Sequence, residues 1–407
     1  MVTLGTTACL LFGLALGAQE PGSDPGSPPQ EKKKPVKVDW RSPRSLVSKE
    51  GGAGTEAALR NALTWLVNHQ NDEGYWSGAK FTDECARLGD EPCEGVGQST
   101  YDVGLTGLCL LVLTGADAAA SRGGFSEEIE RAVEWLLAQQ GSTRLIGVRR
   151  FHDFFYSHLI ATYALCEAYE RIPSDEGKKR VQDAVKYIID AGNPEGGWRY
   201  EVPSVGDSDT SITAWALVTL GTAQKRGILD TQWAIDAGFK WIDEATDASK
   251  SGRIGYDSRG SLSPRTPDNQ HFPRDYTEAM TAAGLWARYF VDRIEGQTEL
   301  VEKQAALILA CPPEEIAFDP DGETYLGNDV YYCYHATYAM FQKGAKAWKS
   351  WNRNMKKVAL ETQLKRGPAK GSWNPDGPWG HAGGRVYQTA LMALCLEVYF
   401  RYPRFSK

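Results

Sequence analysis

The sequence predicts an all-α fold, an (α/α)6 toroid in which six helical hairpins form an inner and an outer helical barrel. First, a threonine followed by small and apolar residues recurs at the same point of six helix-like segments. Second, an amphipathic segment and a glycine- and aromatic-rich loop precede each threonine. Third, no terminal repeat carries the polar capping face that an open solenoid requires, so we expect the ring to close. The six threonines are Thr106, Thr162, Thr213, Thr281, Thr337 and Thr389.

Two kinds of helix alternate in this repeat. The first helix of each pair is amphipathic, with apolar residues at helical spacing along one face. The second is apolar on most faces, as expected of a helix that is buried on more than one side. We expect first helices near 55–70, 126–140, 177–192, 231–246, 298–311 and 345–365, and second helices near 101–115, 154–171, 209–226, 275–293, 329–342 and 385–401.

The loops inside the pairs combine glycine with an aromatic residue, as in 193–198 and 371–379. Glycine ends the first helix in a left-handed turn, and the aromatic side chain folds back over that turn. Two of these connections, 71–100 and 247–274, are unusually long, and long loops in a compact repeat fold are often functional. Both join a first helix to a second one, so we expect both to open onto the same end of the ring.

The N-terminal segment lies outside the repeat. Residues 4–18 form a short apolar run that ends in small residues, which predicts a signal peptide over 1–18. Residues 19–50 are rich in Pro, Gly, Ser and Lys and predict a disordered linker, which leaves 51–407 for the toroid. We therefore expect export to the periplasm or the extracellular space.

Charge and cysteine content limit the partners. The net charge is -7 and no basic patch is visible, which argues against nucleic acid as a partner. A membrane surface is still a possible partner. Cys85 and Cys93 share the loop 71–100, and an oxidising compartment would allow them to pair.

The repeat carries a family resemblance. The stretch Asn-Pro-Glu-Gly-Gly-Trp-Arg-Tyr at 193–200, the Gln/Trp-type loops and the six-fold repeat resemble the prenyltransferase and squalene oxidase repeat superfamily. That resemblance covers about residues 55–402 and implies the α/α toroid of squalene-hopene cyclases, protein prenyltransferase β subunits and complement thioester domains. The stretches 206–215, 351–352 with 371–373, and 379–387 are similar to exported toroid proteins of planctomycete-type bacteria, a subgroup that implies no activity.

Acidic residues gather where the second helices begin, which is one end of the expected ring. An Asp just before a helix is also an ordinary cap, so each residue has a structural interpretation too. The residues four positions before the threonines share the threonine face and would form a polar ring, if that face lines the cavity. The acids are Asp102, Asp153, Asp207, Asp209, Asp275, Glu278 and Asp329, and the ring is Asp102, His158, Asp209, Thr277, Cys333 and Arg385.

One enzymatic interpretation is a terpenoid cyclase, which the resemblance implies. Cyclases protonate an alkene with an Asp-x-Asp-Asp-Thr motif at the head of an inner helix. The matching stretch 206–210 keeps Asp209 and Thr210, but Ser208 stands where the proton-donating aspartate belongs. Asp209, Asp207 and Asp275 are the catalytic candidates of such an enzyme.

A second interpretation is zinc-assisted prenyl transfer. Asp275 and His335 fall on zinc-ligand positions of the prenyltransferase β subunits, whereas Thr277 stands at the thiolate position and is a poor ligand. We therefore predict no zinc and no other cofactor, and an exported chain would meet no prenyltransferase α subunit.

A third interpretation is a carbohydrate-active toroid that uses two carboxylates across a cleft and aromatic platforms. The chain has carboxylates at the expected mouth and 11% aromatic residues. The aromatic candidates are Tyr101, Trp198, Tyr276, Tyr331, Tyr332 and Tyr387.

The preferred interpretation is a central cavity that binds an apolar or isoprenoid-like small molecule, without established catalysis. The enzymes above, and a docking module whose cavity is plugged by side chains such as Tyr331, Tyr332 and Trp286, are the alternatives. The expected ligand-binding residues are Asp102, His158, Glu278, Tyr332, His335, Arg385 and Tyr387.

Overall fold

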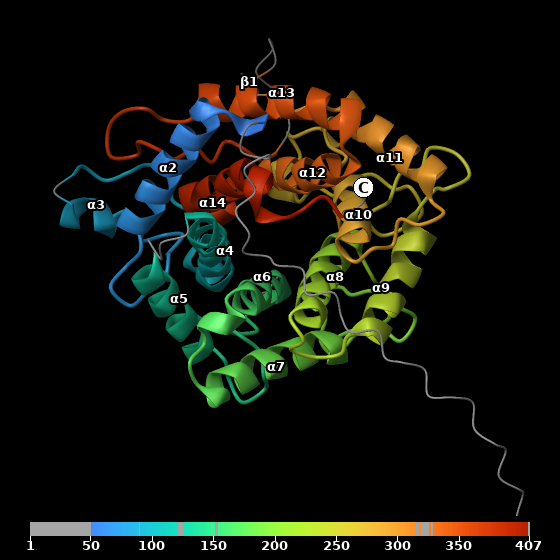
Figure 1. The fold of residues 1–407 in the computed structure, drawn as a ribbon, viewed down its shortest axis with the longest axis horizontal. Helices are drawn as coiled ribbons and strands as arrows, with labels where there is room; N and C mark the ends of the chain where they lie inside the picture. The colour runs from blue at the N-terminus through green and yellow to red at the C-terminus, as the bar shows by residue number, and fades with distance from the viewer. Residues whose placement is uncertain are drawn as a thin grey trace, which may run out of the picture. The chain divides into compact units, whose positions relative to one another are not determined.

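Inner and outer helices alternate along the chain and form two concentric rings in the computed structural model (Figure 1). The structure describes residues 50–405 except 89, 121–124, 151–153, 315–316, 319–324 and 327–328. These residues belong to one unit, 38–407. The predicted signal peptide, nearly all of the predicted linker and Asp153 lie outside the described residues.

The helices of both rings fall where the periodicity predicts them, which confirms the α/α toroid. A short helix, α3 (Asp83–Arg87), lies in the loop after α2, and an antiparallel pair, β1 (Ala317–Phe318) and β2 (Tyr325–Leu326), lies between α11 and α12. The inner helices are α4 (Asp102–Ala120), α6 (Phe154–Glu167), α8 (Thr210–Lys225), α10 (Ala279–Phe290), α12 (Val330–Lys343) and α14 (Gly380–Arg401). The outer helices are α2 (Ala53–Asn68), α5 (Ser126–Ala138), α7 (Asp175–Asp190), α9 (Gln232–Ala245), α11 (Thr298–Ala310) and α13 (Ala345–Thr362).

The two rings differ in burial as their sequences do. In outer helix α7 only one stripe, which includes Val181, Val185 and Ile188, is buried. In inner helix α6 every residue except Tyr156 is buried. One stretch of the described chain, Ser99–Ala118, is long and apolar enough to cross a membrane by composition. This stretch largely coincides with inner helix α4, and 61% of its most apolar 18 residues are buried inside the protein.

The ring is closed, as predicted. Helix α14 packs against both α4 and α2, and α13 packs against α2. A glutamine at the end of an outer helix repeatedly donates its Nε2 to a carbonyl of the next outer helix: Gln70 to Glu128 at 2.9 Å and Gln140 to Arg180 at 2.9 Å. Gln363, after the last outer helix, makes the same bond to Ala58 of the first at 2.8 Å.

The repeated threonine holds the loop of its own repeat. Thr213 Oγ1 accepts a hydrogen bond from the backbone N–H of Trp198 at 3.0 Å, and Trp198 Nε1 donates to the Ile188 carbonyl at 2.7 Å. The indole therefore caps the outer helix while the hydroxyl satisfies the loop, which explains why threonine and a Gly-Trp loop recur together. Equivalent backbone-to-threonine bonds join Trp76 to Thr106, Ile254 to Thr281 and Trp373 to Thr389.

Two inner helices differ from expectation at their N-terminal ends. Helix α10 begins at Ala279 rather than 275, because residues 274–276 form a separate 3-10 turn that ends in extended backbone at Thr277. Helix α14 has an additional turn from Gly380, but Gly384 breaks it with a φ of +63°, so its continuous part starts at the expected residue 385. The other described 3-10 turns are Ser99–Tyr101, Tyr169–Arg171 and Pro267–Asn269.

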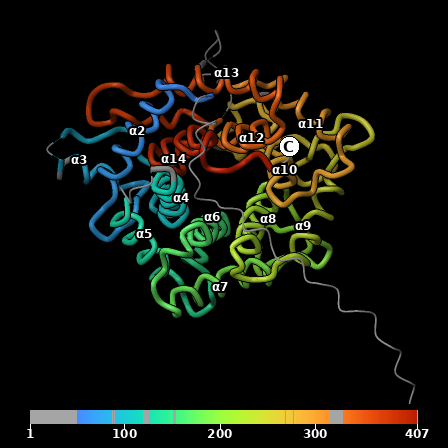
Figure 2. Tube along the Cα trace, in the orientation of Figure 1, coloured from blue at the N-terminus to red at the C-terminus, as the bar shows by residue number. Residues whose placement is uncertain are grey.

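The C-terminal segment fills one end of the ring. After α14 the chain turns toward α10, as Figure 2 shows. The Tyr402 hydroxyl hydrogen-bonds to the Tyr163 hydroxyl and donates to Glu167 Oε1 at 2.9 Å. Trp286, which is fully buried, contacts the rings of Tyr402 and Phe405. The ring is therefore occupied at the C-terminal ends of the inner helices, and Trp286 is one of the side chains that occupy it.

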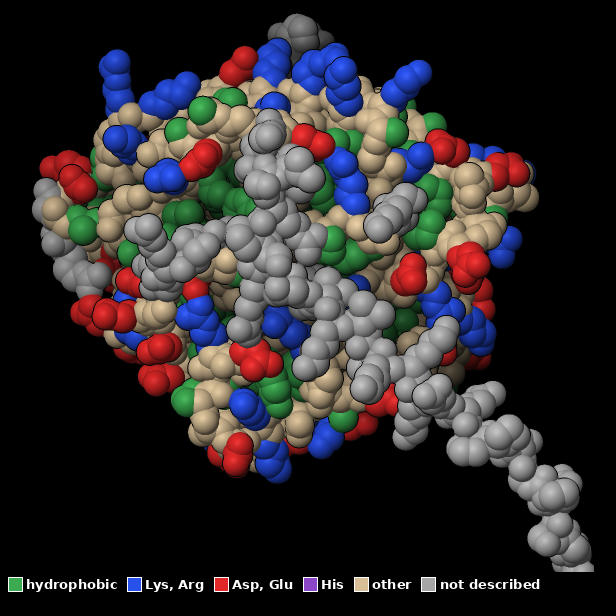
Figure 3. Space-filling model, in the orientation of Figure 1, with side chains coloured by type: hydrophobic (Ala, Val, Ile, Leu, Met, Phe, Trp, Pro, Cys, Tyr) green, Lys and Arg blue, Asp and Glu red, His purple; other side chains and the backbone are tan. Residues whose placement is uncertain are grey.

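Charged side chains of both signs cover the surface seen in Figure 3, with Lys and Arg gathered over the outer helix α13. Lys346, Lys349, Arg353 and Lys357 are all exposed on that helix. This basic ridge is local, since the whole chain carries a net charge of -7.

Candidate functional site

A cavity of about 830 Å³ lies inside the ring at the N-terminal ends of the inner helices. Residues from the first turns of all six inner helices line it, together with residues of the loops that precede those helices. Gln98 and Tyr101 of the first long loop and Arg265 and Thr266 of the second reach the cavity, as expected of both loops. The site therefore draws on every repeat.

The face of the inner helices that lines the cavity is not the threonine face. The residues two positions before the threonines line it in five repeats, and two positions are about 200° of helical rotation. The threonines and the residues four positions before them point instead toward the loops and the outer ring. The five lining residues are Gly104, Ile160, Ser211, Ala279 and Tyr387.

The expected polar ring does not come together around the cavity, because its members satisfy the backbone of the loops. Asp102 accepts a hydrogen bond from the Gly78 N–H at 2.8 Å. Arg385 donates from Nε to the Glu94 carbonyl at 2.6 Å and from a terminal nitrogen to Ser372 Oγ at 3.1 Å. Burial raises the pKa of the Asp102 carboxyl to about 6.

His158 takes over the role of the threonine in the second repeat. Its Nδ1 accepts a hydrogen bond from the Ile146 N–H at 3.0 Å, and its Nε2 lies 3.2 Å from the Ala184 carbonyl, to which it donates. Thr162 Oγ1, at the usual threonine position, has no hydrogen-bond partner among the described residues. Burial lowers the pKa of His158 to about 3, so the ring stays neutral in this role.

Three further predicted ligand or catalytic residues lie outside the cavity wall. Glu278 accepts both Nε (3.0 Å) and a terminal nitrogen (2.6 Å) of Arg253, and also Thr281 Oγ1 at 2.9 Å. Tyr332 donates toward the outer ring, to the Ile308 carbonyl at 3.1 Å. Asp275 is exposed in the turn before α10.

His335 lies beneath the cavity and is 1% exposed. The rings of Trp215, Tyr331 and Tyr334 surround it at centroid distances of 5.2, 4.7 and 4.9 Å. Neither ring nitrogen has a hydrogen-bond partner among the described residues, and burial lowers the pKa of His335 to about 3. Within the described chain no group of three possible metal ligands forms around His335 or Asp275.

Of the three predicted catalytic carboxylates, one lines the cavity and a second lies buried behind its wall. Asp207 lines it, with 72% of its side chain exposed, and lies 3.5 Å from Arg199. Asp209 is fully buried behind the wall as the N-cap of α8, where Oδ1 accepts the Ile212 N–H at 2.9 Å. Its Oδ2 has no hydrogen-bond partner among the described residues and lies 4.0 Å from Arg199 Nε. Burial raises the pKa of Asp209 to about 6.

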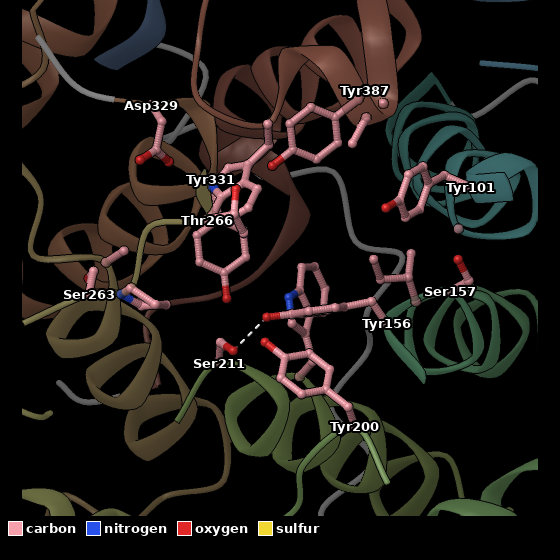
Figure 4. A pocket seen from close by; sticks show the side chains of 18 of the residues that line it. Tyr101, Tyr156, Ser157, Tyr200, Ser211, Ser263, Thr266, Asp329, Tyr331 and Tyr387 are labelled. Atoms are coloured by element: carbon pink, nitrogen blue, oxygen red, sulfur yellow. Dashed lines mark hydrogen bonds between the residues drawn. The ribbon is translucent and has the colours of Figure 1, made fainter. Parts of the chain in front are cut away.

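A hydroxyl chain links this buried carboxyl to the cavity. Tyr156 donates to Ser211 Oγ at 2.5 Å (Figure 4). Ser211 in turn donates to Asp209 Oδ1 at 2.5 Å. Tyr156 and Ser211 both line the cavity, whereas Asp209 does not. The hydroxyls of Tyr200 and Tyr256, also in the wall, lie 3.0 Å apart. Ser211 stands two positions before Thr213, a position whose residues share no polarity from one repeat to the next and which therefore leaves no signal in the sequence.

Tyr331, Tyr387 and Asp329 form the opposite wall (Figure 4). Asp329 caps α12 by accepting the Tyr332 N–H at 2.8 Å, and burial raises the pKa of its carboxyl. Tyr387 is the one predicted ligand-binding residue in the wall. The floor is apolar and includes Leu105, Leu108, Ile160, Met280 and Leu391.

Three solved structures that share this fold are carbohydrate-active proteins by name. The cellobiose 2-epimerase of Bacillus thermoamylovorans B4167 superposes with a TM-score of 0.60 at 14% identity, over 87% of this chain and 99% of the epimerase. An unsaturated glucuronyl hydrolase specific for heparin gives 0.58 at 13% identity, over 85% of this chain and 96% of the hydrolase. The GH76A α-1,6-mannanase of Salegentibacter sp. HEL1_6, an inactive variant in complex with α-1,6-mannotriose, gives 0.56 at 11% identity, over 85% and 99%.

The sequence itself matches no protein-family model and no curated protein. The structural similarities show the α/α toroid fold that the resemblance to squalene cyclase-type repeats implies, and at such low identity they assign no family.

Proposed function

We propose that the cavity binds a carbohydrate and that the protein is a carbohydrate-active enzyme. The observation that carries this proposal is the composition of the wall, which combines tyrosine side chains with carboxylates and arginines at one end of an α/α toroid. Aromatic faces stack on sugar rings, and hydroxyl, carboxylate and guanidinium groups bind sugar hydroxyls. Three structural neighbours that act on saccharides support it.

The buried carboxyl of Asp209 is suited to donate or accept a proton near neutral pH. Its raised pKa of about 6 lies close to the range in which general acids of glycosidases work. The proton would move between Asp209 and the cavity through Ser211 and Tyr156, whose hydroxyls form an unbroken chain. Asp207, which faces the cavity, supplies the second carboxylate that sugar hydrolysis requires.

The test is a panel of manno-, gluco- and uronic-acid oligosaccharides, with chromatographic detection of hydrolysed or epimerised products. Asp209→Asn and Asp207→Asn should each lower kcat by about 100-fold or more. Glu361→Gln is the matched control, because Glu361 is exposed on outer helix α13, away from the cavity. Failure of the wild-type protein to bind any saccharide in calorimetry would refute the proposal.

The apolar floor supports a second candidate function, in which the cavity holds an isoprenoid-like ligand. The protein would either bind this ligand without converting it or cyclise it with Asp209 as the acid. Leu105, Leu108 and Met280 offer a surface on which such a ligand could lie. Lipid extraction of the purified protein followed by mass spectrometry distinguishes the two. A stoichiometric isoprenoid together with no saccharide binding favours the second candidate. A membrane surface as the source of that ligand would be tested with vesicles.

A further inference from the structure

Three potential metal ligands meet at the inner side of the first long loop. His69 follows α2, Cys85 belongs to α3, and Cys93 lies in the extended part of the loop. His69 Nε2 lies 3.4 Å from Cys85 Sγ and 3.6 Å from Cys93 Sγ, and the two sulfurs are 3.3 Å apart. All three side chains are buried, with 3%, 1% and 4% exposure. We refer to them as the His69–Cys85–Cys93 cluster.

The orientation of the imidazole is fixed for ligation. His69 Nδ1 lies 2.7 Å from the Trp65 carbonyl oxygen, a contact that requires the proton on Nδ1. The lone pair of Nε2 therefore points toward the two sulfurs. Histidines that bind metals usually donate their other N–H to a carbonyl or carboxylate in this way. Trp65 also stacks on the imidazole at 4.1 Å, which holds the ring in place.

We propose that the His69–Cys85–Cys93 cluster binds a zinc ion. Tetrahedral zinc with ordinary Zn–S and Zn–N bonds places two sulfurs about 3.8 Å apart and a sulfur and nitrogen about 3.6 Å apart. The three distances in the cluster are close to these values, so small side-chain movements would complete the geometry. Thiolate and imidazole together are the donor set that zinc prefers among the common divalent cations. A water or another exchangeable ligand would fill the fourth position.

This site differs from the family-derived zinc positions at Asp275 and His335 and is independent of what the cavity binds. A reactive dithiol explains the cluster less well, because both thiols are buried and out of reach of reactants in solution. A buried pair of sulfurs beside a properly oriented imidazole is more consistent with a cation that displaces the thiol protons.

The ion would position one wall of the cavity. Directly after Cys93, the Glu94 carbonyl accepts Arg385 Nε at 2.6 Å and the Gly95 carbonyl accepts the Arg385 N–H at 2.8 Å. Gln98, which lines the cavity, donates its N–H to the Ala382 carbonyl at 2.8 Å. The metal would thus fix the loop that joins the first repeat to the last, and it would have a positioning role.

The experiment uses the full chain, purified with reductant and then dialysed without it. Elemental analysis measures bound zinc directly, and titration of the chelated, reduced protein with zinc chloride in competition with a chromophoric chelator measures its affinity. We expect one zinc per chain. Zinc should also protect Cys85 and Cys93 from alkylation, as identified by peptide mass spectrometry, and a chelator should remove that protection.

Cys85→Ser and Cys93→Ser should each lower the zinc affinity by more than the about 10–100-fold that changes around a ligand typically cause. Cys311→Ser is the control, because Cys311 lies outside the cluster at the end of α11, and it should keep the zinc. The alkylation assay needs no variant, so it decides the matter even if the serine variants misfold. The proposal would be overturned if the reduced wild-type protein took up no zinc and Cys85 and Cys93 were recovered as a disulfide or as freely alkylated thiols.

Discussion

In most of the repeats the threonine hydroxyl accepts a hydrogen bond from a backbone N–H of the preceding loop. Without this acceptor the N–H would be buried and unpaired. Thr213→Val removes the acceptor of the Trp198 N–H while keeping the shape of the side chain. We expect a loss of about 1–3 kcal/mol in the free energy of unfolding, measured by urea denaturation. Thr162→Val is the matched control, because the Thr162 hydroxyl is equally buried but has no hydrogen-bond partner in the described chain. Equal losses in the two variants would contradict this role of the threonine.

The buried carboxyl of Asp209 should make stability depend on pH. Its folded pKa of about 6 lies above the ordinary value of 3.8, so between these values the folded state holds more protons than the unfolded state. Stability should therefore fall as pH rises from about 4 to about 6, by at most about 3 kcal/mol, and then level off. Asp209→Asn should reduce this decline between pH 4.5 and 7.5 in urea denaturation, whereas Glu361→Gln should keep it. Asp102, whose pKa burial also raises to about 6, should account for part of the decline that remains. A decline of the same size in Asp209→Asn would assign it to other groups.

At the scale of the elements, the kink in α14 brings that helix against the first long loop. Gly384 has a φ of +63°, and a Cβ there would lie 2.4 Å from the Gly97 nitrogen. Gly384→Ala should therefore displace the loop and lower the melting temperature. Gly206→Ala separates the two causes, because Gly206 also has a positive φ of +97° but has no heavy atom near its Cβ position.

We expect Gly206→Ala to cost only about 1 kcal/mol of backbone strain and Gly384→Ala to cost clearly more. Proteolysis of the loop 90–98 provides a second measurement, since only Gly384→Ala should accelerate it. Indistinguishable melting temperatures would show that the contact with the loop adds nothing to the strain.

The sequence predicts the helices well because burial leaves a periodic pattern in each of them. The outer helices show one apolar stripe, and the loops show glycine and tryptophan where an indole must reach a helix end, as Trp198 does. The pattern could not predict the α10 start, because the turn at 274–276 is helix-like in composition, nor the short β1–β2 pair.

The site was harder to predict, because the most regular polar positions serve the fold. Asp102 and Arg385 lie at a repeated position because each repeat has buried backbone groups in its loop that need a hydrogen-bond partner. The cavity positions, such as Gly104, Ser211 and Tyr387, share no polarity and therefore leave no pattern. The His69–Cys85–Cys93 cluster depends on how one loop folds back, which residue spacing does not specify.

At the scale of the whole molecule, the bond from Gln363 to Ala58 tests closure of the ring. In a closed ring it is equivalent to the bond from Gln140 to Arg180, although it joins residues 305 positions apart. Gln363→Ala and Gln140→Ala should therefore lower the free energy of unfolding by similar amounts, about 1–2 kcal/mol, in single cooperative transitions. A neutral Gln363→Ala beside a destabilising Gln140→Ala would indicate separated ends in solution.

The aromatic side chains around Tyr402 also limit the routes into the cavity. Since Trp286, Tyr402 and Phe405 fill the far end of the barrel, a polymer cannot be threaded through it from one side to the other. If the protein acts on carbohydrates as proposed, substrate and product therefore pass through the same opening, at the N-terminal ends of the inner helices.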